Sequence, residues 1–275
     1  MKRILLVFSS FVFLSACSNQ TNPQVSPVPS SDVFGNTAGG PPPNKNIALV
    51  FNGPGVCAED CAKGAAAAAQ AAGFTPKLVV PADLPNGATA DQVSAFFSGA
   101  GVWVQPGGVS NTAYHSMSQT MIQGLISFVK NGGGYVGFCA GAFMATAQIG
   151  STNAPGLGIF PGSTIPYTPP ASFAHDHSLA FEIANVTWNG VQRYIFFQGG
   201  PYISNNDASV EVVARYNDGA NTVAAARAPY GSGRVFISGP HPEAPDWWAA
   251  GTSAPDPDGS DLAYAAEMIR WAAGE

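Results

Sequence analysis

The sequence predicts an α/β fold with a mostly parallel central sheet and a β-rich antiparallel extension. Two observations carry this prediction. From residue 46 to about 150, short apolar runs alternate with helix-compatible segments, which implies right-handed crossovers between parallel strands. From 151 to 240, β-rich runs follow one another with Gly, Asn and Pro between them. In a parallel sheet of this kind, we expect the functional site at the carboxyl ends of the strands.

The individual elements follow from apolar runs and their stop signals. The predicted strands of the first part are 47–51, 77–80, 101–104 and 135–138, and the predicted helices are 56–73, 91–97, 114–130 and a short one within 140–148. The predicted strands of the extension, in the same sheet, are 181–186, 193–197, 210–215, 222–226 and 234–238. A closing helix is predicted over 261–273.

The first 16 residues have the features of a secretory signal. A basic start, Met1-Lys2-Arg3, precedes a short apolar run that ends in Leu14-Ser15-Ala16-Cys17. This ending resembles a bacterial lipobox, which implies cleavage before Cys17 and attachment of acyl chains such as palmitate. An ordinary signal peptide with a chance cysteine is the alternative. We therefore expect an exported bacterial protein, held on a cell-envelope membrane by lipid at Cys17 rather than by a spanning helix.

Three regions follow from composition. Residues 1–16 are the signal, 17–45 form a tether rich in Ser, Asn, Pro and Gly, and 46–275 make one folded domain. Removing the signal lowers the count of Lys and Arg from 11 to 9 against 17 Asp and Glu, a net charge of −8. An acidic, lysine-poor surface disfavours nucleic acid and anionic lipid as partners. The sequence does not predict the oligomeric state.

Four cysteines have separable roles. Cys17 is the lipid attachment site. Cys57 and Cys61 lie four apart at the start of a predicted helix and are candidates for a disulfide in an oxidising compartment. A bridge within one helical turn is geometrically tight, so the sequence leaves this pairing open. Cys139 is then the unpaired thiol.

Cys139 lies in Gly137-Phe138-Cys139-Ala140-Gly141, between a predicted strand and a predicted helix. A nucleophile in such a turn is held exposed and strained, and only small neighbours let the strand and the helix approach so closely. The partial positive charge of the helix N-terminus favours the thiolate. An inert buried cysteine is the alternative.

The segment His241-Pro242-Glu243 supplies a base and an acceptor to orient it. It follows the last predicted strand, so His241 should lie at the same sheet edge as Cys139. Glu243 as a solvated surface acid is the alternative. Backbone N–H groups for an oxyanion come from Ala140 and from Gly107 or Gly108 after the third strand.

The three segments Pro106-Gly107-Gly108, Gly137 to Gly141 and His241-Pro242-Glu243 resemble, in this order, the signatures of class I glutamine amidotransferase-like proteins. A closer resemblance is to the domain at the N-terminus of eukaryotic biotin–protein ligases, which also occurs alone in bacteria. It rests on residues 51–55, 198–201 and 238–243 and covers about 46–273. The resemblance implies a flavodoxin-like fold, with Cys139 as nucleophile, His241 as base and Glu243 as its orienter. No ligase catalytic domain is recognisable, so biotinylation is not expected.

Other candidate residues surround this site or lie outside it. Asn52, Gly53 and Gly55 after the first strand, with Gln198 and Gly199, are expected to line the substrate site. A dinucleotide site at Gly53-Pro54-Gly55 is disfavoured, because a third glycine and an acidic residue on the second strand are missing. His175-Asp176-His177 is interpreted as a polar loop rather than a metal site. Neither a cofactor nor a metal is predicted.

Two functions remain open at this stage. The first is hydrolysis of a small amide or peptide-like substrate through a thioester on Cys139. The second is a non-catalytic binding or scaffolding module that keeps the shape of the site, which the absence of a recognisable ammonia-accepting domain favours.

Overall fold

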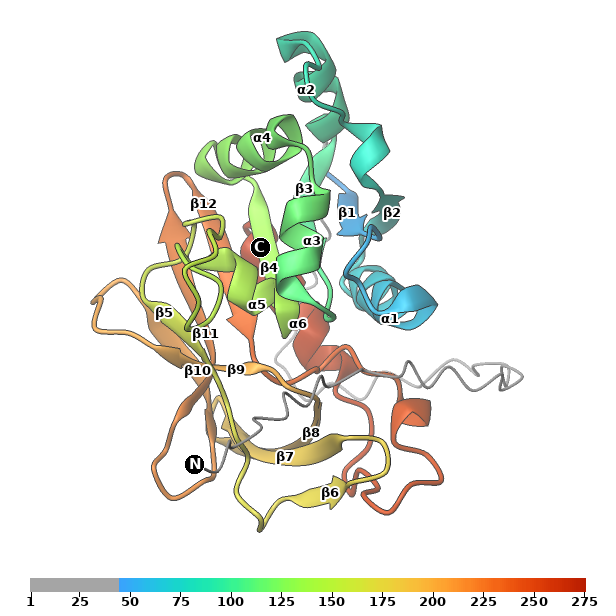
Figure 1. Cartoon of the computed structure of the whole chain (residues 1–275), viewed down its shortest axis with the longest axis vertical. Coiled ribbons are helices and arrows are strands. Elements are labelled where there is room, and N and C mark those ends of the chain that lie inside the picture. Colours follow the sequence, from blue (N-terminus) through green and yellow to red (C-terminus); the bar gives the residue numbers. More distant parts are fainter. Residues whose placement is uncertain (1–44) are drawn as a thin grey trace, which may run out of the picture. The chain divides into compact units, whose positions relative to one another are not determined.

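The computed structural model of the chain describes residues 45–275, so the predicted signal, Cys17 and nearly all of the tether lie outside the described residues. Its main feature is a ten-stranded mixed sheet (Figure 1). The strands of this sheet are β1 (Ile47–Phe51), β2 (Thr75–Val79), β3 (Ala100–Gln105), β4 (Gly134–Phe138), β6 (Ala174–Asp176), β7 (Phe181–Trp188), β8 (Val191–Phe197), β10 (Glu211–Tyr216), β11 (Val223–Tyr230) and β12 (Gly233–Ser238). A separate two-stranded sheet pairs β5 (Ser163–Pro166) with β9 (Pro201–Ser204).

The strand order is β2-β1-β3-β4-β12-β11-β10-β7-β6, with β8 paired to β7. The pairs from β2 to β12 are parallel, and those from β12 onward are antiparallel. The predicted mixed α/β fold is therefore confirmed. One detail differs from the prediction: the run 234–238 does not lie only in the antiparallel extension, because β12 also pairs in parallel with β4. It is the strand that joins the two halves of the sheet.

Helices cover both faces of the parallel half (Figure 1). On one face, α1 (Ala58–Ala71) packs against α6 (Leu262–Ala273), and both helices belong to the core cluster that contains Val102 and Val104 of β3. The opposite face carries α3 (Ser110–Ser116), α4 (Gln119–Lys130) and α5 (Ala140–Ala145), with α2 (Ala90–Phe97) beside α4. Trp103 of β3 is fully buried under this second layer. Two 3-10 turns, η1 (Pro81–Asp83) and η2 (Asp246–Trp248), complete the described elements.

Two predicted helices are shorter in the structure than in the sequence prediction. The run 114–130 is divided, because Met117 has an extended backbone with ψ 142° and Ser118 begins a new helix. The Ser118 hydroxyl accepts a hydrogen bond from the Met121 amide at 2.9 Å, which is typical of an N-cap. The helix expected within 140–148 ends at Ala145, where Thr146 returns to extended backbone.

Within the described part of the chain, no helix has both the length and the apolar character needed to cross a bilayer.

Candidate active site

Cys139 lies at the sharp turn between β4 and α5. It is one of the few non-glycine residues with positive φ in residues 45–275, at φ 47° and ψ −99°. Strand and helix approach closely here: a Cβ on Gly137 would lie 2.5 Å from the carbonyl carbon of Gly141. The Cys139 amide donates a hydrogen bond to the Ser238 carbonyl at 2.8 Å, so the end of β12 helps to hold the strained turn.

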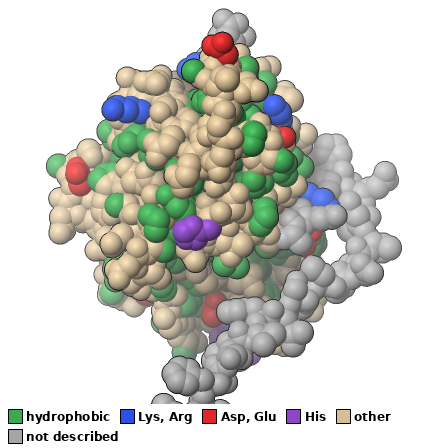
Figure 2. Space-filling view, turned by 45° about the horizontal axis from the view of Figure 1, so that its top comes forward, with side chains coloured by type: hydrophobic (Ala, Val, Ile, Leu, Met, Phe, Trp, Pro, Cys, Tyr) green, Lys and Arg blue, Asp and Glu red, His purple; other side chains and the backbone are tan. Residues whose placement is uncertain are grey.

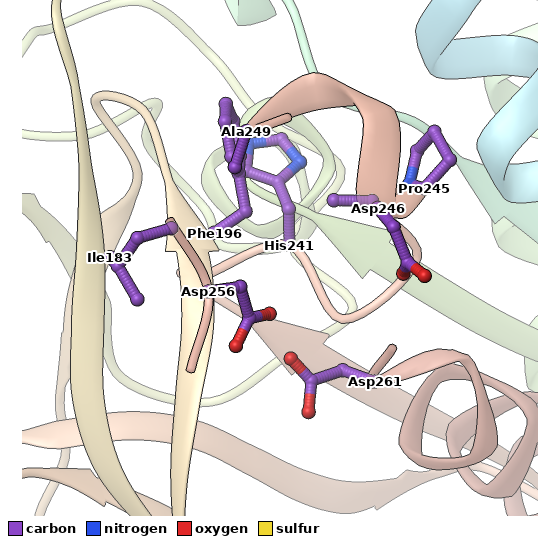
Figure 3. Close-up of a pocket in the computed structure, with 9 residues that line it drawn as sticks. Ile183, Phe196, His241, Pro245, Asp246, Ala249, Asp256 and Asp261 are labelled. Atoms are coloured by element: carbon purple, nitrogen blue, oxygen red, sulfur yellow. The ribbon is translucent and has the colours of Figure 1, made fainter. Parts of the chain in front are cut away.

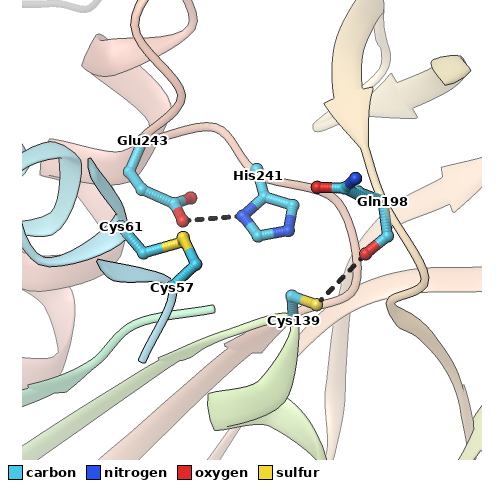
Figure 4. Close-up of a disulfide and its surroundings, with 6 residues drawn as sticks. All are labelled: Cys57, Cys61, Cys139, Gln198, His241 and Glu243. Carbon is cyan, nitrogen blue, oxygen red and sulfur yellow. Dashed lines mark hydrogen bonds and ion pairs between the residues drawn. A yellow bond between two sulfur atoms is a disulfide. The ribbon is translucent and has the colours of Figure 1, made fainter. Parts of the chain in front are cut away.

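His241 and Glu243 form a buried pair just after β12. Glu243 Oε1 lies 2.8 Å from His241 Nδ1, and the exposed fractions are 4 % for His241 and 1 % for Glu243. The His241 amide donates to the Phe196 carbonyl at 2.8 Å. The Trp248 ring packs edge-on against the imidazole, with the two ring centroids 5.8 Å apart. Glu243 is therefore an interior carboxylate that orients the imidazole, not a solvated acid (Figure 4).

The charges around His241 favour its protonated form. Burial alone lowers the pKa of His241, but the negative charges of Glu243 and Cys139, together with side-chain hydrogen bonds to both, raise it to about 10. The Cys139 side chain therefore lies close enough to the imidazole for its charge to act on the pKa of His241. The structure thus brings Cys139, His241 and Glu243 together at the carboxyl ends of two adjacent parallel strands.

The Cys139 sulfur also faces a backbone carbonyl. Its exposed fraction is 4 %, and Sγ donates to the Gln198 carbonyl at 3.5 Å (Figure 4). A carbonyl oxygen accepts from a thiol and repels a thiolate, whereas an imidazolium attracts the thiolate. The sulfur therefore lies near both the Gln198 carbonyl and the His241 imidazole.

Of the predicted oxyanion donors, Ala140 directly follows Cys139 as the first residue of α5, and its N–H has no carbonyl within the helix to bond. Gly107 packs against His241: an added Cβ would lie 2.5 Å from imidazole Cε1. Gly108, at φ 131°, packs against Gly55 and the amide of Cys57, where a side chain would not fit.

The predicted substrate-lining residues lie in two segments, one directly after β1 and one directly after β8. Gly55 lies beside the loop after β3, and its carbonyl accepts the Val109 amide at 2.7 Å. Gln198 reaches Cys139 through its carbonyl, while its side-chain amide donates to the Leu179 carbonyl at 3.3 Å. Gly199 is exposed, whereas the Asn52 amide donates to Val79 on the β2 side, next to Gly53.

Cys57 and Cys61 form a disulfide across the first turn of α1, with their Cα atoms 5.3 Å apart. The bridge lies beside the His241–Glu243 pair (Figure 4). Cys139 is a free, buried cysteine.

A small cavity lined in part by aspartates lies beside His241. The cavity has a volume of about 10 Å³, the size of one water molecule, and is bordered by His241, Asp256 and Asp261 (Figure 3). Burial raises the pKa of Asp256 to about 6 and that of Asp261 to about 7.

The ring centroids of His175 and His177 lie 4.0 Å apart, but within the described residues no group of three or more His, Cys, Asp or Glu side chains is placed to hold a metal ion.

Sequence reasoning missed Tyr216, which lies near Cys139. The Tyr216 hydroxyl of β10 donates to the Pro201 carbonyl at 2.9 Å, beside the point where Gly200 and Gly239 cross in close contact. Burial raises the pKa of Tyr216, and the Cys139 charge contributes to the same rise. Tyr216 thus supports both the Gln198 and the His241 segments. No local motif marks it, since its neighbours come together only through sheet topology.

Comparison with solved structures defines the class of fold. A glutamine amidotransferase matches at a TM-score of 0.52 and 18 % identity, over 72 % of this chain and 90 % of that one. The PurLQS structure from Thermotoga maritima matches at a TM-score of 0.52 and 19 % identity, over 82 % of this chain and 97 % of that one. The protein therefore has a class I glutamine amidotransferase-like, flavodoxin-like fold, as the sequence predicted.

Comparison with protein families and with curated proteins finds similarity over part of the chain. Residues 86–156 match the family model described as "Biotin-protein ligase, N terminal", a segment that contains Gly107, Gly108 and Cys139. The chain is 32 % identical over 158 residues to the biotin–protein ligase of Schizosaccharomyces pombe, covering 51 % of this chain and 25 % of that protein. It is 29 % identical over 153 residues to an uncharacterized protein of Chlamydia muridarum, covering 51 % of this chain and 59 % of that protein. The match spans less than two thirds of either relative.

Proposed function

We propose that the protein is a lipid-anchored cell-envelope hydrolase that cleaves an amide through a thioester on Cys139. The observation that carries the proposal is the buried His241–Glu243 pair, joined at 2.8 Å and within reach of a cysteine at a strained strand-to-helix turn. A nucleophile, a base and a residue that orients the base are the parts that acyl transfer by cysteine requires.

In the proposed reaction, His241 takes the thiol proton and the Cys139 sulfur attacks the amide carbonyl carbon. The oxygen becomes an oxyanion, for which the Ala140 N–H is a donor and Gly107 or Gly108 a second candidate. The imidazolium returns its proton to the leaving nitrogen as the C–N bond breaks, which leaves an acyl thioester. A water molecule, deprotonated by His241, then attacks the thioester, and the thiol and the acid are released.

Selective alkylation tests the activated cysteine. The full-length protein is treated with iodoacetamide at pH 6, and modification of Cys139 is followed by mass spectrometry. Compared with His241→Ala, wild type should react at least about tenfold faster, because the imidazolium holds the sulfur as thiolate. Equal rates would contradict the proposal.

A non-catalytic binding module is the second candidate, and one observation favours it. The thiol donates to the Gln198 carbonyl and is almost inaccessible, an arrangement that suits a neutral, unreactive cysteine. Calorimetry with glutamine, γ-glutamyl peptides and peptidoglycan fragments separates the two functions. Equal binding by wild type and Cys139→Ser, with no product formed, would favour the module. Product formed by wild type but not by the variant would favour the hydrolase.

A further inference from the structure

The His241–Glu243 pair rests on one face of α1. Gly107 separates the imidazole from the disulfide: an added Cβ would lie 2.5 Å from His241 Cε1 and 3.5 Å from Cys61 Sγ. Gly64, one helical turn after Cys61, contacts the other member of the pair, since its added Cβ would lie 2.9 Å from the Glu243 carbonyl oxygen. One face of α1, which carries Cys61 and Gly64, therefore packs beside the pair; the disulfide at Cys61 is drawn next to it in Figure 4.

The position of Glu243 depends on its packing against α1, because its carboxylate makes few hydrogen bonds. Oε1 is bonded to His241, whereas Oε2 is buried and has no hydrogen-bond partner among the described residues. A buried carboxylate with one free oxygen is fixed by packing rather than by a network of hydrogen bonds. Any movement of α1 away from the pair would admit water and weaken the attraction between carboxylate and imidazolium.

The disulfide fixes the first turn of α1 to its N-cap residue, and the residues just before that cap contact the loop that carries Gly107. Cys57 is the N-cap of α1 but makes no side-chain capping bond, so the covalent link to Cys61 takes the place of a cap. The preceding residue, Val56, bridges to Gly108, and the Val109 amide donates to the Gly55 carbonyl at 2.7 Å. The bridge thus ties together the first turn of α1 and the two loops beside His241. Cys57 is exposed, so a reductant can reach it, while Cys61 is 3 % exposed.

We propose that the Cys57–Cys61 disulfide is a positioning element for the His241–Glu243 pair, and that its reduction loosens the pair and lowers the reactivity of Cys139. In that reduction, a dithiol supplies two electrons and two protons, the S–S bond becomes two thiols, and the dithiol becomes a disulfide. The consequence for Cys139 rests on the proposed function, whereas the effect on His241 does not depend on whether an amide is cleaved.

The test is a titration of His241 by NMR in full-length protein carrying labelled histidine, with the His241 signal assigned by its loss in His241→Gln. Three samples are compared: oxidised protein, protein reduced by dithiothreitol, and the double variant Cys57→Ser/Cys61→Ser. In the second and third samples, we expect the His241 midpoint to fall by at least about one pH unit towards the ordinary histidine value. Cys139 alkylation at pH 6 should slow about tenfold in the same samples. Identical titrations in all three would overturn the inference.

A matched variant separates positioning from general loss of stability. Ile122→Val alters the core on the opposite face of the sheet, in α4. Reduction and Ile122→Val are compared at temperatures equally far below their Tm values, and only reduction should move the His241 midpoint. Equal shifts in both would overturn the positioning role.

The two proposals fail separately. If reduction moves the His241 midpoint but Cys139 reacts equally fast with and without His241, the proposed function is wrong and the inference stands. If alkylation depends on His241 but neither readout responds to the disulfide, the inference is wrong and the proposed function stands.

Discussion

At the scale of single residues, the backbone of Cys139 is the most informative feature. Its φ of 47° and ψ of −99° lie outside the regions that L-residues ordinarily occupy, a conformation that costs about 1–3 kcal/mol. Several hydrogen bonds maintain it: the Cys139 amide bonds Ser238, and its carbonyl accepts from Ala142 and Phe143. The surrounding structure thus holds a residue in a position where glycine would be favoured.

Glycine should therefore stabilise the fold at this position. We expect Cys139→Gly to unfold at higher urea than Cys139→Ala, by about 1 kcal/mol in the free energy of unfolding, because only glycine adopts positive φ without strain. The control is Ala142→Gly within α5, where the same exchange of Ala for Gly should cost about 1 kcal/mol. If glycine is the worse residue at both positions, the turn is not strained.

The raised pKa of His241 makes stability depend on pH. Its pKa is about 10 in the folded protein and about 6.5 in the unfolded chain, so the folded state binds more protons between these values. The contribution of His241 is fully present below about pH 6.5 and is lost as the pH rises towards 10.

Glu243→Gln should reduce this dependence, since Glu243 is the largest contribution that raises the pKa of His241. We expect the free energy of unfolding of wild type to fall more steeply than that of the variant between pH 7 and 9. Urea midpoints at each pH measure this difference, and groups other than His241 cancel to first order in the comparison. Parallel curves for the two proteins would contradict the attribution to this pair.

At the scale of elements, local patterns predicted most strands and helices, because apolar runs and Gly or Pro stops are local signals. The division of 114–130 was missed, since Ser118 lies in an otherwise continuous helical pattern and is identified as a cap only by its bond to Met121. Strands β5, β6 and β9 were missed because they are short and take their pairing from distant segments. The parallel pairing of β12 with β4 is likewise a property of the whole sheet.

The cap at Ser118 has a measurable energy. We expect Ser118→Ala to lower the free energy of unfolding by about 1 kcal/mol, because the hydroxyl accepts from the Met121 amide and also donates to the Leu84 carbonyl at 2.5 Å. The control, Ser127→Ala, lies on the exposed side of the same helix and should be neutral or slightly stabilising. Chemical denaturation compares the two. Equal effects would mean that Ser118 is an ordinary helical serine.

At the scale of the whole molecule, the candidate site was predictable in its parts but not in its surroundings. Cys139, His241 and Glu243 follow from short motifs, and α/β topology places strand ends at one edge of the sheet. The Gln198 carbonyl that faces the thiol and the position of Gly107 between His241 and Cys61 require three-dimensional packing. Only 10 % of the residues of the chain are charged, and charged side chains are accordingly sparse on the face shown in Figure 2.

Anchoring of the whole molecule by lipid is a proposal that the cysteines make testable. When the full-length chain is expressed in a bacterium fed an alkyne analogue of palmitate, we expect label on wild type and on Cys139→Ala but none on Cys17→Ala. Gel fluorescence after coupling to a dye measures the label. Label that persists in Cys17→Ala would contradict anchoring at this residue.

The place of β12 in the sheet also determines when the site can come into existence. Cys139 directly follows the parallel strand β4, and His241 follows the adjacent strand β12, which is the last strand of the sheet along the described part of the chain. Every residue between Cys139 and His241 must be made, and the antiparallel half must fold, before the two can meet. A chain that is truncated before His241 therefore contains Cys139 and its turn but lacks the His241–Glu243 pair, so under the proposed function its thiol would not be activated.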